Sequence, residues 1–246
     1  MKQMIEIRNL NFLYPDGNQA IRDINLDVFQ GDSLGIIGRN GAGKSTLLLH
    51  LNGLLSGKGV LKIIDKAVCE ENIDFIRQKV GFVFQDPQDQ LFMPTVYEDV
   101  AFGPQNLGWS QEEIDKQVEY ALEEVGMRDK KNHLSHHLSL GEQKRVSIAT
   151  VLSMSPEILV LDEPNSNLDP ASRRHLIGLL QSLKISKIIA THDLEMVLEI
   201  CQRVVLLDNG RIISDGKTEE ILSDKELLES HGLEVPLSLS LTRNLY

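Results

Sequence analysis

The chain has 246 residues, 41% of them hydrophobic and 25% charged, which is typical of a folded globular protein. No apolar run reaches the roughly 20 residues that a membrane-spanning helix needs, and the first residues lack the apolar core of a signal peptide. We therefore expect a cytoplasmic chain that reaches a membrane only through a partner. A net charge of −11 disfavours the broad basic surface of nucleic-acid-binding proteins, so no nucleic-acid partner is expected.

The first 37 residues predict strands of two kinds. Segments 5–8 and 21–28 alternate apolar and polar residues with period two, as half-buried antiparallel strands do. Segment 33–37 is a continuous apolar run, as expected for a buried parallel strand. A glycine-rich loop follows it, and a helix is predicted from Thr46 onward.

The middle of the chain, about 87–155, differs from both ends. Segment 110–125 is acidic and amphipathic, with Ile114, Val118 and Leu122 at helical spacing. We predict a helical subdomain here, inserted into the sheet-forming sequence.

Strands and helices alternate again from residue 156. Strands are predicted at 158–161, 187–190, 203–207 and 211–214, and helices at 171–183 and 194–201. Asp208-Asn209-Gly210 indicates a hairpin turn. Thr218 is predicted to cap a final helix. Segment 237–241 has three open interpretations: an edge strand, a contact with a partner, or a frayed tail.

The loop after the first apolar strand matches the phosphate-binding P-loop pattern, Gly-x₄-Gly-Lys-Ser. Its glycines let backbone N–H groups surround a β-phosphate, and the next helix directs its N-terminal dipole at the same anion. Lys44 adds a positive charge, and the Ser45 hydroxyl can ligate Mg²⁺. We predict a nucleotide site whose contributing residues are Gly38, Arg39, Asn40, Gly41, Ala42, Gly43, Lys44, Ser45 and Thr46.

Two carboxylates follow the apolar strand at 158–161. Asp162, at the end of a buried strand, can hold Mg²⁺ through water, and Glu163 can orient the attacking water or accept its proton.

These elements together resemble the ATP-binding-cassette (ABC) ATPases over nearly the whole chain. Further motifs follow in the family's order: Phe-Leu-Tyr-Pro at 12–15, Phe-Gln-Asp at 84–86, Leu-Ser-Leu-Gly-Glu at 138–142, Asn-Leu-Asp at 167–169 and Thr-His-Asp at 191–193. The resemblance implies that Tyr14 stacks on adenine. It implies that Gln85 reaches Mg²⁺ and the water, and that His192 is the switch histidine. It makes Ser139 and Gly141 the signature donors and Asp169 the aspartate of the D-loop.

The resemblance also implies the fold. The implied fold is that of an α/β P-loop NTPase with a RecA-like, mostly parallel sheet, an N-terminal antiparallel β subdomain and an inserted helical subdomain. We expect a single ABC ATPase domain over 1–246. Its core would be 1–86 and 156–232, its helical subdomain with the signature 87–155, and its tail 233–246.

The signature differs from the common Leu-Ser-Gly-Gly-Gln. Leu140 replaces a glycine, which restricts the backbone there, and Glu142 replaces the glutamine. In the family, the signature faces the γ-phosphate held by a second subunit. The resemblance therefore implies a dimer, with an identical chain or a paralogue, that closes on two ATP molecules and reopens on hydrolysis.

The segment at 86–108 resembles the energy-coupling-factor branch of these ATPases, and the cobalt and nickel importers most of all. The resemblance implies integral membrane subunits as partners and a peripheral position on the cytoplasmic face of the membrane. One alternative is a vitamin importer of the same branch. Another is a soluble ABC ATPase that acts on nucleic acid or ribosomes. The acidic charge and the lack of sustained heptads between Lys44 and Ser139 disfavour the second alternative.

Overall fold

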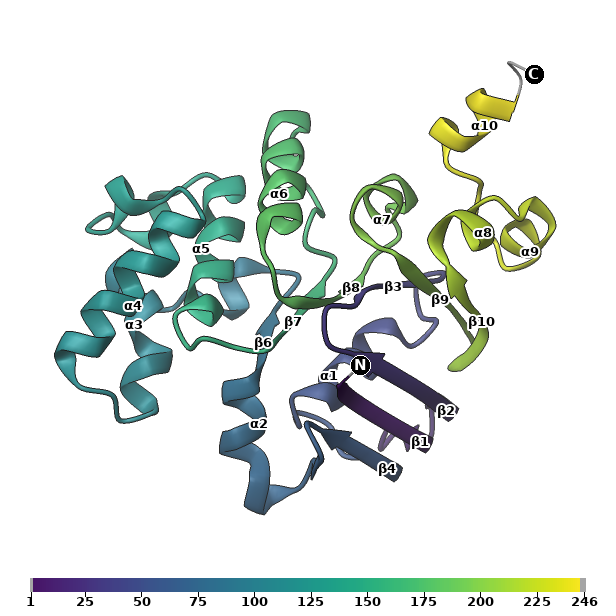
Figure 1. Ribbon diagram of the computed structural model, residues 1–246, viewed down its shortest axis with the longest axis horizontal. Coiled ribbons are helices and arrows are strands. Elements are labelled where there is room, and N and C mark those ends of the chain that lie inside the picture. Colours follow the sequence, from purple (N-terminus) through teal and green to yellow (C-terminus); the bar gives the residue numbers. More distant parts are fainter. Residues whose placement is uncertain (1, 244–246) are drawn as a thin grey trace. The chain divides into compact units, whose positions relative to one another are not determined.

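The computed structural model describes residues 2–243 and divides the chain into two compact units (Figure 1). The first unit combines Met1–Arg77 with Ile185–Tyr246, and the second is Gln78–Lys184. Helix α2 (Ile73–Lys79) runs across the first of these boundaries in the sequence.

The first unit begins with an antiparallel sheet in the strand order β2-β1-β4-β5. Its strands are β1 (Gln3–Leu13), β2 (Gln19–Phe29), β4 (Lys58–Ile63) and β5 (Lys66–Ala67). Alternate residues of β1 and β2 are buried, among them Ile5, Ile7, Ile24 and Leu26. The period-two prediction is therefore confirmed, although both strands extend beyond the predicted segments.

The second sheet of this unit is built on β3 (Ser33–Ile37), which pairs in parallel with β8 (Ser186–Ala190) and β9 (Arg203–Asp208). All five residues of β3 and of β8 are buried, as expected for continuous apolar strands. The antiparallel strand β10 (Arg211–Lys217) follows β9 through the predicted hairpin. Asn209 and Gly210 both have positive φ in that turn, at 47° and 75°.

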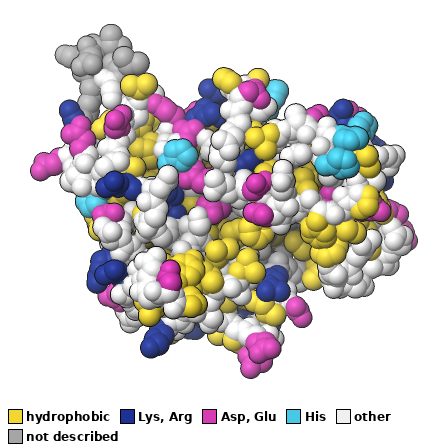
Figure 2. All heavy atoms as spheres, turned by 180° about the vertical axis from the view of Figure 1, so that it is seen from behind, with side chains coloured by type: hydrophobic (Ala, Val, Ile, Leu, Met, Phe, Trp, Pro, Cys, Tyr) yellow, Lys and Arg dark blue, Asp and Glu magenta, His cyan; other side chains and the backbone are white. Residues whose placement is uncertain are grey.

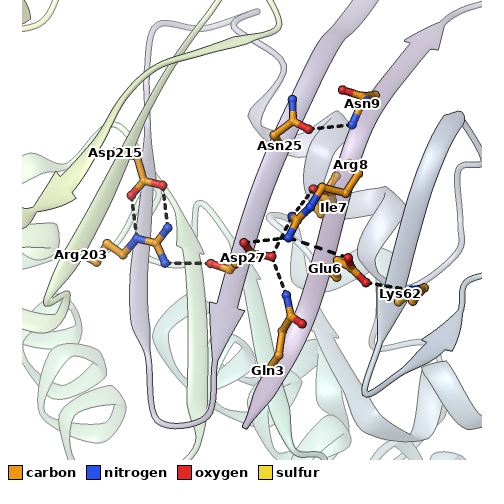
Figure 3. A network of polar contacts seen from close by, with 10 residues as sticks. All are labelled: Gln3, Glu6, Ile7, Arg8, Asn9, Asn25, Asp27, Lys62, Arg203 and Asp215. Atoms are coloured by element: carbon orange, nitrogen blue, oxygen red, sulfur yellow. Dashed lines mark hydrogen bonds and ion pairs between the residues drawn. The ribbon is translucent and has the colours of Figure 1, made fainter. Parts of the chain in front are cut away.

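A polar network connects these two sheets within the first unit (Figure 3). Arg203 of β9 donates two hydrogen bonds of 2.6 Å to the Asp215 carboxylate and one of 2.8 Å to the Asp27 carbonyl in β2. Arg8 of β1 contacts the Asp27 carboxylate at 2.8 Å. The guanidinium of Arg203 therefore connects β10 with β2. The helices of this unit, α2 apart, are α1 (Lys44–Leu51), α7 (Leu194–Ile200), α8 (Thr218–Leu222), α9 (Lys225–Ser230) and α10 (Leu237–Arg243).

The second unit contains the parallel pair β6 (Val80–Val83) and β7 (Ile158–Asp162) with four α-helices in its described residues. They are α3 (Val96–Asn106), α4 (Gln111–Glu124), α5 (Leu140–Leu152) and α6 (Pro170–Ser182). Three of them begin with a capping box, in which the N-cap hydroxyl and a glutamate three residues later bond to each other's backbone N–H. The predicted helix at 110–125 is α4, with Ser110 as its N-cap.

Two predictions near the end of the chain need correction. Thr218 is the first residue of α8 and not its N-cap, which is Lys217. The Thr218 hydroxyl donates to the Cys201 carbonyl at 2.8 Å, so it does not cap the helix. Two more helices follow α8, so it is not the last. The edge-strand interpretation of 237–241 is wrong, because Leu237–Arg243 forms α10. In the described part of the chain, no helix has the length and hydrophobicity to cross a membrane.

Candidate functional site

The glycine-rich loop leaves β3 at the carboxyl end of the parallel strands and leads into α1. Gly38 has φ of 152°, and a Cβ there would lie 2.1 Å from the Leu207 carbonyl oxygen. Gly43 has φ of 105°, and its Cβ would lie 2.6 Å from the Ala20 carbonyl oxygen. Side chains at these positions would displace the loop from β9 and β2, which explains why the loop needs glycine here.

The loop holds the side chain of Lys44 in its interior. Lys44 is only 6% exposed, and its Nζ donates to the carbonyls of Gly38 at 2.8 Å and Arg39 at 3.3 Å. Gly38, Ala42, Gly43 and Thr46 are buried as well, whereas Arg39, Asn40, Gly41 and Ser45 are exposed. The cation therefore lies inside a backbone cradle whose outer residues remain accessible.

Tyr14 lies next to this loop. Its hydroxyl is 3.1 Å from the Thr46 hydroxyl, and its ring packs edge-on against Phe12, with 4.8 Å between the ring centroids. Phe12 packs in the same way on His50 of α1. The Nδ1 of His50 lies 2.7 Å from the Thr46 carbonyl oxygen, and burial lowers the pKa of His50. A row of three rings therefore holds Tyr14 beside the helix that carries Lys44.

His192 follows β8, and its side chain is exposed. Because β8 and β3 are parallel neighbours, His192 and the glycine-rich loop follow strands that end at the same edge of one sheet. The first unit thus holds Tyr14 beside the predicted loop and places His192 at the same sheet edge as that loop.

The second unit brings Gln85 and the two acidic residues to one edge in the same way. Gln85 follows β6, and Asp162 ends the parallel neighbour β7. Asp162 and Glu163 are 8% and 7% exposed. Glu163 has φ of 41°, a left-handed conformation that is rare for residues other than glycine. Strain of this kind is concentrated at functional sites, because surrounding contacts must maintain it.

The predicted signature forms the start of α5. Ser139 is the N-cap, and its backbone N–H and hydroxyl both bond the Glu142 carboxylate at 2.9 Å. These hydrogen bonds from Ser139 lower the pKa of Glu142. Leu140 is the first helical residue and has no positive φ, so the leucine causes no backbone strain here. A Cβ on Gly141 would lie 2.5 Å from the Ser172 hydroxyl oxygen of α6, so this glycine is needed for close packing.

Asp169, predicted to be the aspartate of the D-loop, is the N-cap of α6. Its carboxylate accepts from the backbone N–H groups of Ala171 and Ser172 and caps α6. Hydrogen bonds from Ser172, its side chain first and then its backbone, lower the pKa of Asp169. Two buried residues near these motifs were not predicted, Lys144 and Asp99. Their residue types give no signal, because lysine and aspartate are mostly exposed in folded proteins.

The residues present fit a triphosphate with Mg²⁺. In the first unit, the glycine cradle and Lys44 suit phosphate oxygens, and the Ser45 hydroxyl is an oxygen donor of the kind that Mg²⁺ accepts. In the second unit, the Gln85 amide and the Asp162 carboxylate offer oxygen donors of the same kind. Bound Mg²⁺ would neutralise charge on the phosphates. A parallel sheet with this loop and a carboxylate at the end of a second buried strand defines the class of P-loop nucleoside triphosphatases.

Comparison with known proteins identifies the family. The model of the ABC transporter family matches residues 21–166, more than half of the chain. An energy-coupling factor transporter ATP-binding protein EcfA of Carboxydothermus hydrogenoformans is 48% identical over 245 residues, covering 98% of this chain and 90% of that protein. The chain therefore belongs to the ABC transporter family of ATP-binding proteins, and it is an ATPase that uses ATP and Mg²⁺.

Two solved structures have the same fold. CbiO1 from Clostridium perfringens, described as part of the transporter complex cbiONQ, has a TM-score of 0.84 and 37% identity, covering 99% of this chain and all of that one (100%). The ATP-binding cassette MJ0796, a dimer bound to ADP and Pi, has a TM-score of 0.78 and 27% identity, covering 87% and 99%. The predicted fold class, with its antiparallel and parallel sheets and added helices, is confirmed.

Proposed function

We propose that this ATPase powers a membrane importer of the energy-coupling-factor type, for cobalt or nickel ions. It would act as a dimer, with itself or with a paralogue, at the cytoplasmic face of the membrane, bound to integral membrane subunits. Support for the type comes from the relative named EcfA, and support for the metal comes from the structural neighbour CbiO1. A vitamin importer of the same branch is the main alternative, because the membrane subunits, not the ATPase, contact the substrate.

The observation that carries the membrane partner is an exposed aromatic pair in the second unit. Phe92 is 60% exposed and Phe102 of α3 is 39% exposed, and their rings pack edge-on with centroids 4.9 Å apart. Hydrophobic side chains gather on the surface of the unit that contains α3 to α5 (Figure 2). Single exposed hydrophobic residues are common, whereas contiguous exposed apolar side chains favour a binding surface.

A cavity of about 420 Å³ borders the same loop. It is lined by apolar and polar side chains, among them Leu91, Phe92, Met93, His136 and Gln143. A groove with apolar walls and a few polar groups suits an amphipathic helix of a partner. We propose that a cytoplasmic helix of the membrane subunit binds here.

Within the ATPase, the proposed roles follow the chemistry of the residues. Lys44 and the loop N–H groups bind the phosphates, and Tyr14 stacks on the adenine. Glu163 orients or deprotonates the attacking water, assisted by His192 and Gln85. Ser139 and Gly141 serve the nucleotide of the partner subunit.

The importer is tested by co-expressing the chain with candidate membrane subunits, purifying the complex and measuring uptake of Co²⁺, Ni²⁺ and vitamins into vesicles. ATP-dependent uptake of a metal supports the proposal. Uptake of a vitamin and of neither metal would make a vitamin the substrate class. Failure of the ATPase to copurify with any membrane subunit would refute the proposed importer function.

The docking surface is tested by Phe92→Glu. A buried charge at a hydrophobic contact should abolish copurification with the membrane subunits, while ATP binding by the ATPase stays normal. Tyr120→Glu is the matched control, because Tyr120 is an aromatic residue of α4 that is 51% exposed and does not line the cavity. Equal loss of copurification in both variants would contradict a specific surface.

A further inference from the structure

Lys144 is a buried cation within the helix that the signature begins. It lies in the second turn of α5 and is 2% exposed. Its Nζ donates to the Gln85 carbonyl at 2.8 Å, the Glu163 carbonyl at 3.3 Å and the Ser166 hydroxyl at 2.9 Å. An ammonium group has three N–H donors, so these three acceptors use all of them.

The three acceptors belong to three different functional segments. Gln85 follows β6, Glu163 follows β7, and Ser166 lies in the loop before α6. Two of the contacts are to backbone carbonyls, so they restrain the chain itself and not only a side chain. One ammonium group therefore connects the helix that begins with the signature to the loops that carry the predicted hydrolytic residues.

Burial disfavours the charged form of the Lys144 ammonium group. Desolvation lowers the pKa of Lys144 to about 8, against the opposing effect of the carboxylates of Asp86, Glu163 and Asp162. A buried cation destabilises a fold unless good hydrogen bonds compensate it, and the three acceptors provide that compensation.

Two residues near the contacts of Lys144 have strained backbone conformations. Glu163 and Asn167 have φ of 41° and 61°, conformations that persist only where neighbouring contacts maintain them. A cavity of about 310 Å³ borders the same loops, lined by Gln85, Asp86, Leu140, Lys144, Ser166 and Asn167. The hydrogen bonds from Lys144 to Gln85, Glu163 and Ser166 therefore restrain these loops from the side of α5, next to the cavity.

We propose that Lys144 is a positioning residue for ATP hydrolysis, which holds the backbone of Gln85 and Glu163 in a set position relative to the signature helix. The inference rests on the proposed roles of Gln85 and Glu163. It extends them, because the signature serves the nucleotide of the partner subunit while Gln85 and Glu163 serve their own. A displacement of α5 on contact with the partner's nucleotide would be transmitted through Lys144 to the hydrolytic loops of the same chain.

The test compares Lys144→Met, Lys144→Arg and the control Lys116→Met in the full-length protein. Methionine has a similar length but cannot donate, arginine keeps charge and donors, and Lys116 is an exposed lysine of α4. Lys144→Met should lower kcat by on the order of 10- to 100-fold with KM within about twofold, because misplaced groups slow chemistry more than binding. Lys144→Arg should recover part of kcat, and Lys116→Met should match the wild type.

Ser166→Ala keeps the test decisive if Lys144→Met does not fold. It removes one acceptor of the ammonium and should lower kcat in the same direction with normal ATP binding. Added to a folded Lys144→Met protein, Ser166→Ala should have little further effect, because both changes break the same restraint. Wild-type kcat in a folded Lys144→Met protein, or in Ser166→Ala where the first variant is unfolded, would overturn the proposal.

Glu163→Gln separates this inference from the proposed site. If Glu163→Gln hydrolyses ATP at the wild-type rate, the proposed role of Glu163 is wrong, and the inference fails with it. If Glu163→Gln is inactive and Lys144→Met is fully active, the site stands and only the role of Lys144 is refuted.

Discussion

Asp99 organises the loop that carries the proposed docking surface, and its removal gives a quantitative test. Asp99 is 3% exposed. Its carboxylate accepts from the backbone N–H groups of Phe92 and Met93, each at 2.9 Å, and from the Ser135 hydroxyl. Asp99→Ala would remove the acceptor of all three donors at a buried position.

The expected loss of stability follows from these contacts. Hydrogen bonds to a charged group contribute about 1.5–3 kcal/mol each, so three sum to roughly 4.5–9 kcal/mol. Burial of the carboxylate, which raises the pKa of Asp99, offsets several kcal/mol of that sum. We expect Asp99→Ala to lower the free energy of unfolding by about 3 kcal/mol. Asp99→Asn keeps an acceptor oxygen and should cost about 1 kcal/mol.

Urea unfolding at neutral pH measures both variants. Asp99→Ala should also weaken copurification with the membrane subunits, because Phe92 loses its backbone restraint. A change below about 0.5 kcal/mol for Asp99→Ala would refute the reasoning, since that is the range of ordinary surface substitutions.

The pH dependence of the free energy of unfolding, compared between the wild type and Asp99→Asn, tests the sign of the pKa shift. Burial first, and the nearby Glu98 charge to a smaller extent, raise the pKa of Asp99 in the folded state above its unfolded value of 3.8. Between these two values the folded state binds more protons than the unfolded state, so stability falls as pH rises through this window. The wild type should therefore lose stability relative to Asp99→Asn as pH rises from below 3.8. A stability difference between the wild type and Asp99→Asn that stays constant across this pH range would contradict the raised pKa of Asp99.

The remaining predictions concern hydrolysis. Glu163→Gln should keep ATP affinity and trap an ATP-bound dimer, measured by gel filtration with ATP; rapid turnover would remove Glu163 from its role. Lys44→Ala should lower ATP affinity by at least about tenfold, as seen by equilibrium dialysis, because a buried charged contact to phosphate is lost; unchanged affinity would contradict the loop assignment. Ser139→Arg should abolish ATPase activity alone but regain part of it when mixed with Lys44→Ala, since one composite site in the mixed dimer would be intact. No recovery in the mixture would argue against the two-chain site.

The sequence alone determined the parts of this protein whose chemistry is local. The glycine-rich loop between a buried strand and a helix needs specific backbone angles, so its pattern identifies it without tertiary information. The strands at 33–37 and 158–161 were predictable because a strand buried on both faces is continuously apolar. Asp162 and Glu163 could be singled out because they follow such a strand in a chain that also carries a P-loop, where a carboxylate can hold Mg²⁺ and its neighbour can orient water.

The tertiary structure decided whatever depends on segments distant in the sequence. Lys144 and Asp99 are charged residues of types that are mostly exposed, and only the fold shows that loops around Gln85, Glu163 and Phe92 enclose them. Thr218 matched a capping signal, but its hydroxyl bonds the Cys201 carbonyl, 17 residues earlier. The alternating pattern at 237–241 suited a strand, yet a strand needs a neighbour for its backbone groups, whereas the helix α10 satisfies its own.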